Sequence, residues 1–240
     1  MSSLIQSLDR HFYPQSSRRW DDCLFRERVL AHLRAEHTML DLGAGRGRIP
    51  EMNFRGMVAL VCGLDPDESV LRNQNLDQAR VGVAEKIPWP DANFDVVFSD
   101  NVFEHLPDPM AAFREVYRVL KPGGYFFIKT PNRFHYVPLA SSLTPHRFHQ
   151  WFNAKRETES RDTFPTLYRA NTRRRLRYLA RATGFEVVEI TPVEGRPEYL
   201  RFNPLMYACG IVYERAVNAA KSLSCFRVVL MSTFRTPQAH

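Results

Sequence analysis

The stretch TMLDLGAGRGRIPEM, residues 38–52, decides how this sequence folds. An apolar run ends at Asp41 and Leu42, and Gly43, Gly45 and Gly47 follow it at every second position. Glycine is needed where the backbone approaches a ligand closely or takes a positive φ angle. An apolar strand, a glycine turn and then a helix are typical of nucleotide-cofactor sites. We therefore expect residues 38–43 to be a strand, followed by a cofactor-binding turn and a helix.

Strand-like and helix-like segments alternate along the rest of the chain, which predicts a parallel sheet with helices on both faces. The fold class is therefore α/β, a Rossmann-like sheet of seven strands. The further expected strands are residues 57–65, 80–85, 94–100, 125–130, 185–190 and 226–234. The expected helices are 20–36, 108–120, 171–185 (capped at Asn171 or Thr172 and ended by Gly184) and 203–223. Residues 131–170 have no clear period and are expected to be irregular.

The spacing of the three glycines indicates which kind of ligand the turn binds. Dinucleotide-binding folds use G-x-G-x-x-G with a helix N-terminus at the pyrophosphate, whereas this turn reads G-x-G-x-G directly after Asp41. A carboxylate at that point suits a cationic or neutral ligand better than a pyrophosphate. S-adenosylmethionine has an ammonium group, a sulfonium and no phosphate, so it is the expected cofactor. A nicotinamide-dependent oxidoreductase and a turn without a ligand are the alternatives.

The stretches LDLGAGRG, GLDPDES, AEKIPWPDANFDVVFSDNVFEHLPDP and REVYRVLKPGGYFFIKTPN extend this reading. From Met39 to Thr130 the sequence resembles class I S-adenosylmethionine-dependent methyltransferases, of the group that includes ubiquinone and menaquinone biosynthesis methyltransferases. The resemblance covers about ninety consecutive residues plus the last two strands. It implies S-adenosylmethionine as cofactor and a final strand that runs antiparallel. It does not single out an acceptor.

The resemblance also implies where the cofactor lies. It places Asp65 at the ribose hydroxyls, although Asp65 also begins a good helix-capping sequence. It places Ala84 and Glu85 at the adenine, where the chain has Val83 at a position that is often Asp in the family. The expected cofactor-binding set is Asp41, Gly43, Ala44, Gly45, Gly47, Asp65, Pro66, Ala84, Glu85, Asp100 and Asn101.

Methyl transfer mainly requires alignment of the acceptor with the methyl group, together with removal of one proton where the acceptor is a hydroxyl. His105 is the best-placed candidate base, and the alternative that it only shapes the cofactor pocket stays open. The segment 131–170 is expected to cover the active site and to carry acceptor contacts. The catalytic candidates are His105, His146 and His149, with His135 and Tyr168 as further possibilities.

The net charge of +7 is concentrated in one part of the chain, since residues 131–181 hold 11 Lys and Arg against 3 Asp and Glu. The arginines of 173–181 are expected to be a solvated helix face or an attraction for anionic acceptors. Ser99-Asp100-Asn101-Val102 stands where base-amino methyltransferases have D/N-P-P-Y/F, which argues against nucleic acid. Four scattered cysteines predict free thiols and no metal site. The sequence start lacks the features of a secretory signal, and we expect a cytoplasmic protein.

The helix at 203–223 has Leu205, Cys209, Val212 and Ala216 on one side. We expect that side to pack on the sheet or on a second subunit, or to make a peripheral contact of 201–223 with the inner membrane face. The expected organisation is one domain: a helical cap (1–36), the cofactor-binding core (37–130), a substrate lid (131–170) and C-terminal helices and strands (171–240).

The predicted function is methyl transfer from S-adenosylmethionine to a small-molecule acceptor, anionic or lipid-linked. Within that class we predict O-methylation of a sugar or lipid-linked glycan precursor, with a quinone-like lipid ring as the alternative. An RNA methyltransferase and a non-catalytic cofactor-binding module are the minority readings.

Overall fold

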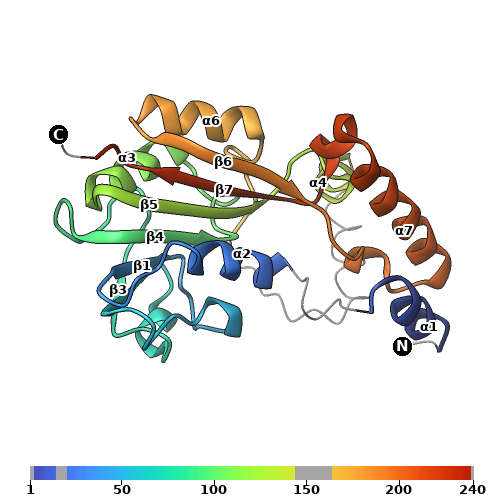
Figure 1. Ribbon diagram of the computed structural model, residues 1–240, viewed down its shortest axis with the longest axis horizontal. Coiled ribbons are helices and arrows are strands. Elements are labelled where there is room, and N and C mark those ends of the chain that lie inside the picture. The colour runs from blue at the N-terminus through green and yellow to red at the C-terminus, as the bar shows by residue number, and fades with distance from the viewer. Residues whose placement is uncertain (1–2, 15–20, 144–163, 239–240) are drawn as a thin grey trace.

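The protein is described by a computed structural model that covers residues 3–14, 21–143 and 164–238. Seven strands form one sheet in the order β3-β2-β1-β4-β5-β7-β6 (Figure 1). All neighbouring pairs are parallel except the two made by β7, which is antiparallel to β5 and β6. The strands are β1 (Thr38–Leu42), β2 (Leu60–Asp65), β3 (Gln78–Val81), β4 (Phe94–Asp100), β5 (Leu120–Pro131), β6 (Glu186–Val193) and β7 (Val229–Arg235). The predicted seven-stranded sheet and its antiparallel last strand are confirmed.

Helices cover both faces of the sheet. Figure 1 shows α3 (Pro109–Val119) and α6 (Arg173–Ala182) on one face and α2 (Asp21–Leu30) on the other. Side chains alternate between the faces along each buried strand. In β5, for example, Phe126 packs into the core beneath α3 and α6, whereas Phe127 packs into the core beneath α2.

The predicted signals at the two ends of α6 are confirmed. The Thr172 hydroxyl accepts a hydrogen bond from the Arg175 N–H at 3.1 Å and caps α6, which settles the choice between the two expected caps. Gly184 follows that helix with a φ of +91°. The Asp108 carboxylate caps α3 in the same way.

The predicted helix after the glycine turn is wrong. Only a short 3₁₀ turn, η2 (Pro50–Met52), follows it. Pro50 has no N–H to donate and keeps Ile49 extended, so a helix cannot run through this position. The chain between β2 and β3 is equally abbreviated and holds the 3₁₀ turn η3 (Glu68–Arg72).

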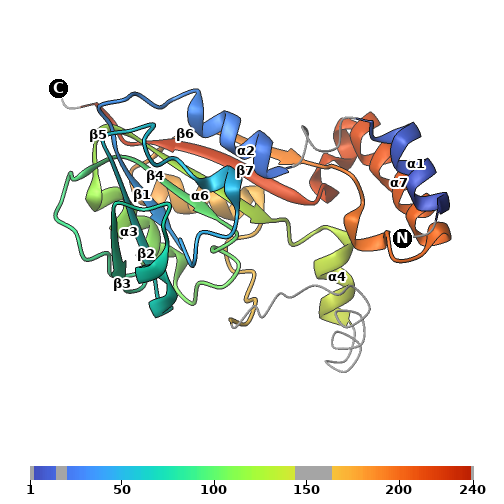
Figure 2. The ribbon, with the colours of Figure 1, turned by 90° about the horizontal axis from the view of Figure 1, so that it is seen from below.

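A smaller helical unit lies beyond the carboxyl ends of β4 and β5 (Figures 1 and 2). It contains α1 (Ser3–Phe12), α4 (Tyr136–Leu143) and α7 (Pro204–Ala219), with η4 (Glu198–Leu200) and η5 (Lys221–Phe226) on either side of α7. Ile5 of α1 packs on Tyr207 and Ile211 of α7 in a core of their own. The insertion between the last two strands is therefore helical, as predicted, and α7 ends four residues before the expected boundary.

In the described part of the chain, no helix has both the length and the apolar composition needed to cross a membrane. The four cysteines are unpaired thiols.

Candidate functional site

A pocket of about 200 Å³ lies at the carboxyl ends of β1 and β4. This is the point where the strand order reverses, because β1 has β2 on one side and β4 on the other. Open α/β sheets bind their ligands at such points. The lining residues are Asp41, Gly43, Ala44, Gly45, Arg46, Gly47, Arg48, Ile49, Met52, Asn75 and Asp100. Six of the eleven predicted cofactor-binding residues are among them.

The glycine turn needs its glycines for two physical reasons. Gly43, Gly45 and Gly47 have φ angles of +88°, +44° and +70°, which side chains adopt only with strain. A Cβ on Gly43 would also lie 2.1 Å from a methyl group of Val102. At Gly45, in contrast, the nearest atom to such a Cβ is 3.9 Å away, in the carboxylate of Asp65. The backbone at Gly45 is therefore open to a ligand.

Asp65 holds the turn in place at the end of β2. Its two carboxylate oxygens accept hydrogen bonds from the Gly45 N–H at 2.9 Å and the Asp67 N–H at 2.8 Å. Burial raises the pKa of Asp65, and these two hydrogen bonds oppose the rise. Each oxygen keeps a second lone pair with which it can accept a hydroxyl hydrogen.

Two buried carboxyl groups, those of Asp41 and Asp100, form the floor of the pocket. Burial, together with the charges of Asp100 and Asp65, raises the pKa of Asp41 well above its usual range. Burial likewise raises the pKa of Asp100 to about 7, against the opposing effect of Lys129. Both Asp100 carboxylate oxygens are buried and lack a hydrogen-bond partner within the described structure, although Lys129 Nζ is 3.0 Å from Oδ1. Such a floor favours a cationic ligand.

Lys129 is a site residue that the sequence reasoning missed. Its fully buried ammonium group, near the end of β5, forms ion pairs with Asp100 and with Asp21 and Asp22 at the start of α2. Burial alone would lower its pKa, but the three carboxylates raise it. The available signal was a lysine inside the apolar strand YFFIKT. Through Lys129, the first turn of α2 is tied to the floor of the pocket.

The other predicted cofactor residues do not line the pocket. Ala84 is buried and Pro66 is exposed. The Glu85 carboxylate accepts a long hydrogen bond, at 3.4 Å, from the N–H of Asp108. Asn101 follows β4 with a φ of +54° and donates its N–H to the Lys129 carbonyl at 2.9 Å. Their contacts with a cofactor stay predictions.

His105 lies next to a buried polar network. Its Nδ1 is 3.2 Å from the Pro165 carbonyl, and its Nε2 is 3.9 Å from the carboxylate of Glu104. Glu104, 4% exposed, accepts a hydrogen bond from the Thr130 hydroxyl, which in turn accepts one from the Asn171 side chain. The network joins the chain after β4, the end of β5 and the start of α6. Sequence reasoning missed Glu104, Thr130 and Asn171 as site residues.

The remaining histidine candidates are placed differently. His146 and His149 lie outside the described residues. His135 is buried against Tyr136 and Tyr213, where α4 meets α7, and burial lowers its pKa to about 3. Tyr168 has a φ of +51° and donates its N–H to the Glu104 carbonyl.

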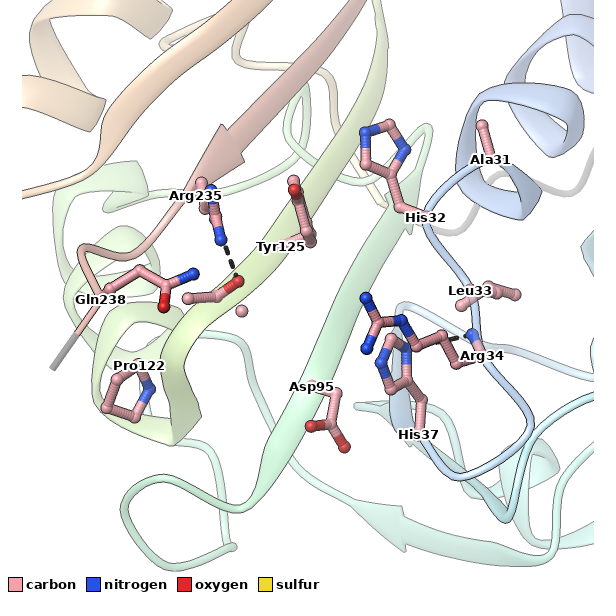
Figure 3. A pocket seen from close by; sticks show the side chains of 12 residues that line it. Ala31, His32, Leu33, Arg34, His37, Asp95, Pro122, Tyr125, Arg235 and Gln238 are labelled. Atoms are coloured by element: carbon pink, nitrogen blue, oxygen red, sulfur yellow. Dashed lines mark hydrogen bonds between the residues drawn. The ribbon is translucent and has the colours of Figure 1, made fainter.

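Figure 3 shows a larger pocket, of about 350 Å³, at the amino ends of β1, β4 and β5. It lies at the opposite end of the strands from the glycine turn, and none of the predicted site residues lines it. Its carboxylate, Asp95, is already paired, because Lys121 Nζ lies 2.7 Å away and Thr38 donates its N–H at 2.8 Å. The charge of this pocket thus gives no reason to place a cationic cofactor here.

The residues at the smaller pocket fit S-adenosylmethionine. The buried carboxyl of Asp100, whose Oδ2 has no hydrogen-bond partner among the described residues, and the carboxyl of Asp41 match an ammonium and a sulfonium group. The open backbone at Gly45 and the free lone pairs of Asp65 match a ribose. No arrangement of helix N-terminus and glycine turn for a pyrophosphate is present among the described residues, since a 3₁₀ turn stands at that place.

Comparison with known proteins shows what this chain is similar to. Residues 40–128 match the model of a methyltransferase domain. A protein of Mycolicibacterium smegmatis named as a probable S-adenosylmethionine-dependent methyltransferase is 36% identical over 113 residues, which are 45% of this chain and 44% of that protein. A ubiquinone biosynthesis O-methyltransferase of Pseudomonas putida is 39% identical over 108 residues, 40% of this chain and 44% of that enzyme.

The chain thus spans under half the length of these relatives. Among solved structures, the YcgJ protein of Bacillus subtilis aligns with a TM-score of 0.55 at 20% identity over 90% of this chain and 99% of that one, which supports the fold. Residues 40–128 therefore match a methyltransferase domain, and within that part the chain is similar to S-adenosylmethionine-dependent methyltransferases.

Proposed function

We propose that this protein transfers the methyl group of S-adenosylmethionine to an oxygen atom of a small-molecule acceptor. The observation that carries the proposal is the carboxylate floor of Asp41 and Asp100 beneath an open glycine turn, inside the matched domain. When bound, S-adenosylmethionine supplies an electrophilic methyl group. Asp41 and Asp100 hold its cationic methionine end, and Asp65 accepts hydrogen bonds from the ribose. Ala84 and Glu85 border the adenine.

His105 is the proposed base for a hydroxyl acceptor. With a proton on Nδ1 donated to the Pro165 carbonyl, Nε2 keeps a free lone pair. Nε2 can then take the acceptor proton, and the Glu104 carboxylate, 3.9 Å away, stabilises the imidazolium that results. The buried hydrogen bonds of Glu104 keep that carboxylate in place. His146 and His149 remain proposed acceptor contacts.

The acceptor we propose is a sugar or a lipid-linked glycan precursor. The support is the basic and aromatic composition of residues 131–170, which suits sugar rings and phosphate groups. A quinone-like lipid ring is the second candidate, favoured by the 39% identity to ubiquinone biosynthesis O-methyltransferases. We propose a cytoplasmic enzyme, and nucleic acid is not among the proposed acceptors.

A labelled methyl group tests both statements. Purified protein is incubated with methyl-labelled S-adenosylmethionine and a small-molecule extract of the source cells, and the products are partitioned between butanol and water. Label in butanol indicates a lipid-linked glycan or a quinone, which mass spectrometry then separates. Label in water indicates a free or nucleotide-bound sugar. No transfer by a protein that binds the cofactor would overturn the proposal in favour of a binding module.

The base assignment has its own test. We expect His105→Gln to lower kcat by about 10² to 10⁴-fold while the Kd for S-adenosylmethionine changes little. His37→Gln, at the opposite edge of the sheet, is the matched control and should leave both constants unchanged. An equal loss of cofactor affinity in His105→Gln would instead assign His105 to the cofactor pocket.

A further inference from the structure

Helix α7 is apolar on two opposite sides. One side packs inward and includes Tyr207, Ile211 and Val217. The other side faces outward, where residues three or four positions apart form a straight line. We call this line the α7 stripe; it consists of Leu205, Cys209, Val212, Ala216 and Ala219, all of them exposed. The expectation that this side packs on the sheet is therefore wrong, because the Tyr207 side is the one buried, against α1.

The two large side chains of the α7 stripe are more exposed than the other large apolar side chains of the described residues. Leu205 is 68% exposed and Val212 is 69% exposed, the two highest values among the large apolar side chains in the described residues. Further apolar side chains are exposed close by in sequence, at Phe202 and Met206. A helix that is apolar all round is normally covered on all sides, and a contiguous exposed apolar surface marks an interaction site.

In the same helical unit, the acidic side chains are paired inside, whereas the exposed charged side chains are basic. Asp9 and Glu198 pair with Arg196 and Arg201 inside the unit, and Glu214 accepts a hydrogen bond from Tyr13. In the described parts of 3–14 and 194–227, no acidic side chain is classed as exposed. The exposed ionisable side chains are basic: Arg10, His11, Arg215 and Lys221. Arg215 reaches Glu214 at 3.4 Å and still exposes 57% of its side chain.

The unit also lies at the end of the molecule where an acceptor must enter. Residue Pro131, the last of β5, pairs with Val229, the first of β7, so α4 and α7 both connect at the carboxyl edge of the sheet. The cofactor pocket opens at that same edge. Figures 1 and 2 show α1, α4 and α7 beyond it in both views.

We propose that the α7 stripe and its basic neighbours dock this protein onto an anionic lipid bilayer. The apolar side chains would enter the boundary between headgroups and acyl chains, and Arg215 and Lys221 would meet lipid phosphates. A second copy of the chain is a poorer occupant, because its own surface is equally basic and brings no acidic partner. The docking rests on the surface alone, while its purpose, access to a lipid-linked acceptor, rests on the proposed function.

Vesicle sedimentation of the full chain tests the docking. The vesicles contain phosphatidylcholine with or without about 30% phosphatidylglycerol, an anionic content high enough to attract polybasic segments. The variant Leu205→Gln/Val212→Gln removes the two most exposed side chains of the stripe. Its matched control is Leu71→Gln/Val188→Gln, which makes the same chemical change at side chains 59% and 53% exposed outside the helical unit. Calorimetry with S-adenosylmethionine is run on all proteins.

We expect binding to the anionic vesicles, weaker binding to phosphatidylcholine alone, and a loss of binding at about 0.5 M salt. The stripe variant should bind about tenfold more weakly, and the control variant should match the wild type. Equal binding by all three proteins, or none by the wild type, would overturn the proposal. A dimer that dissociates in the stripe variant, without vesicle binding, would assign the surface to a second copy. Unchanged cofactor affinity in every variant would show that the substitutions leave the proposed cofactor site intact, so a failure of docking would not count against that site.

Discussion

Replacing Lys129 by methionine tests the electrostatics of the pocket floor. The substitution keeps the length of the side chain but removes the ammonium that pairs with Asp21, Asp22 and Asp100. Because the ammonium is fully buried, the carboxylates it leaves behind are also poorly solvated. Removing one partner from a buried ionic group costs about 3–5 kcal/mol of the free energy of unfolding. We expect that loss at pH 8.

The loss should shrink in acid. Asp100 has a folded pKa of about 7 even beside Lys129, against 3.8 as the reference value. Without the ammonium the folded pKa rises further, so at pH 5.5 the folded carboxyl is neutral while the unfolded one is still ionised. A raised folded pKa favours the folded state as the pH falls, and each pH unit between the two pKa values is worth about 1.4 kcal/mol. Between pH 8 and pH 5.5 this carboxyl stabilises the variant by up to about 3.4 kcal/mol and the wild type, whose folded pKa is already about 7, by about 2 kcal/mol, so the loss should shrink by about 1 kcal/mol.

Urea unfolding of the variant and the wild type at both pH values measures this difference. The control is Lys121→Met, which breaks the partly exposed pair with Asp95 and should cost under about 1 kcal/mol at either pH. The double variant Lys129→Met/Asp100→Asn should regain part of the loss at pH 8. A loss below about 1 kcal/mol at pH 8, or an equal loss at both pH values, would refute the reasoning.

The other predictions concern the cofactor. Gly43→Ala should lower the affinity for S-adenosylmethionine in a calorimetric titration and cost about 2–4 kcal/mol of the free energy of unfolding, because its Cβ would meet Val102. Its control is Gly56→Ala, where φ is +78° and the space around the Cβ is open. This control should cost only about 1 kcal/mol and leave the affinity unchanged. Asp65→Ala should weaken cofactor binding by tenfold or more, and unchanged affinity would contradict its assignment. Because burial raises the pKa of Asp100 to about 7, cofactor affinity should rise between pH 6 and pH 8 as this carboxyl ionises, and Asp100→Asn should flatten that rise.

The sheet could be predicted because its signals are local. The apolar runs, the glycine turn and the capping residues each act within a few positions, and the structure follows them from β1 to β7. The helix expected after the glycine turn is absent because Pro50 interrupts it. Pro50 is a local signal too, but the strand–turn–helix pattern favours a helix more strongly than the proline opposes it. The orientation of α7 could not be read from its sequence, because both sides of the helix are apolar. Its packing depends on Ile5, two hundred positions earlier in the chain.

The residues of the candidate site also differ in whether a local signal predicts them. Asp41 and Gly45, which line the pocket, could be predicted as cofactor residues because a single motif carries them. Lys129 and Glu104 were missed because their importance comes from partners in other elements: α2 for the lysine, and β5 for the glutamate. A charged residue inside an apolar strand, as in FFIKT, indicates that a partner exists but does not name it.

The charges of the pocket affect both the binding of the cofactor and the release of its demethylated product. Asp41 and Asp100 are held at raised pKa values, so the folded chain without a ligand bears the cost of placing buried carboxylates together. A cation in the pocket relieves that cost, which makes cofactor binding and stability reinforce each other. Methyl transfer converts a sulfonium into a neutral thioether and so removes one positive charge from the ligand. The carboxylate floor therefore favours the substrate cofactor over its demethylated product. In the proposed reaction, the charge arrangement that attracts S-adenosylmethionine would therefore weaken the binding of the product once the methyl group has left.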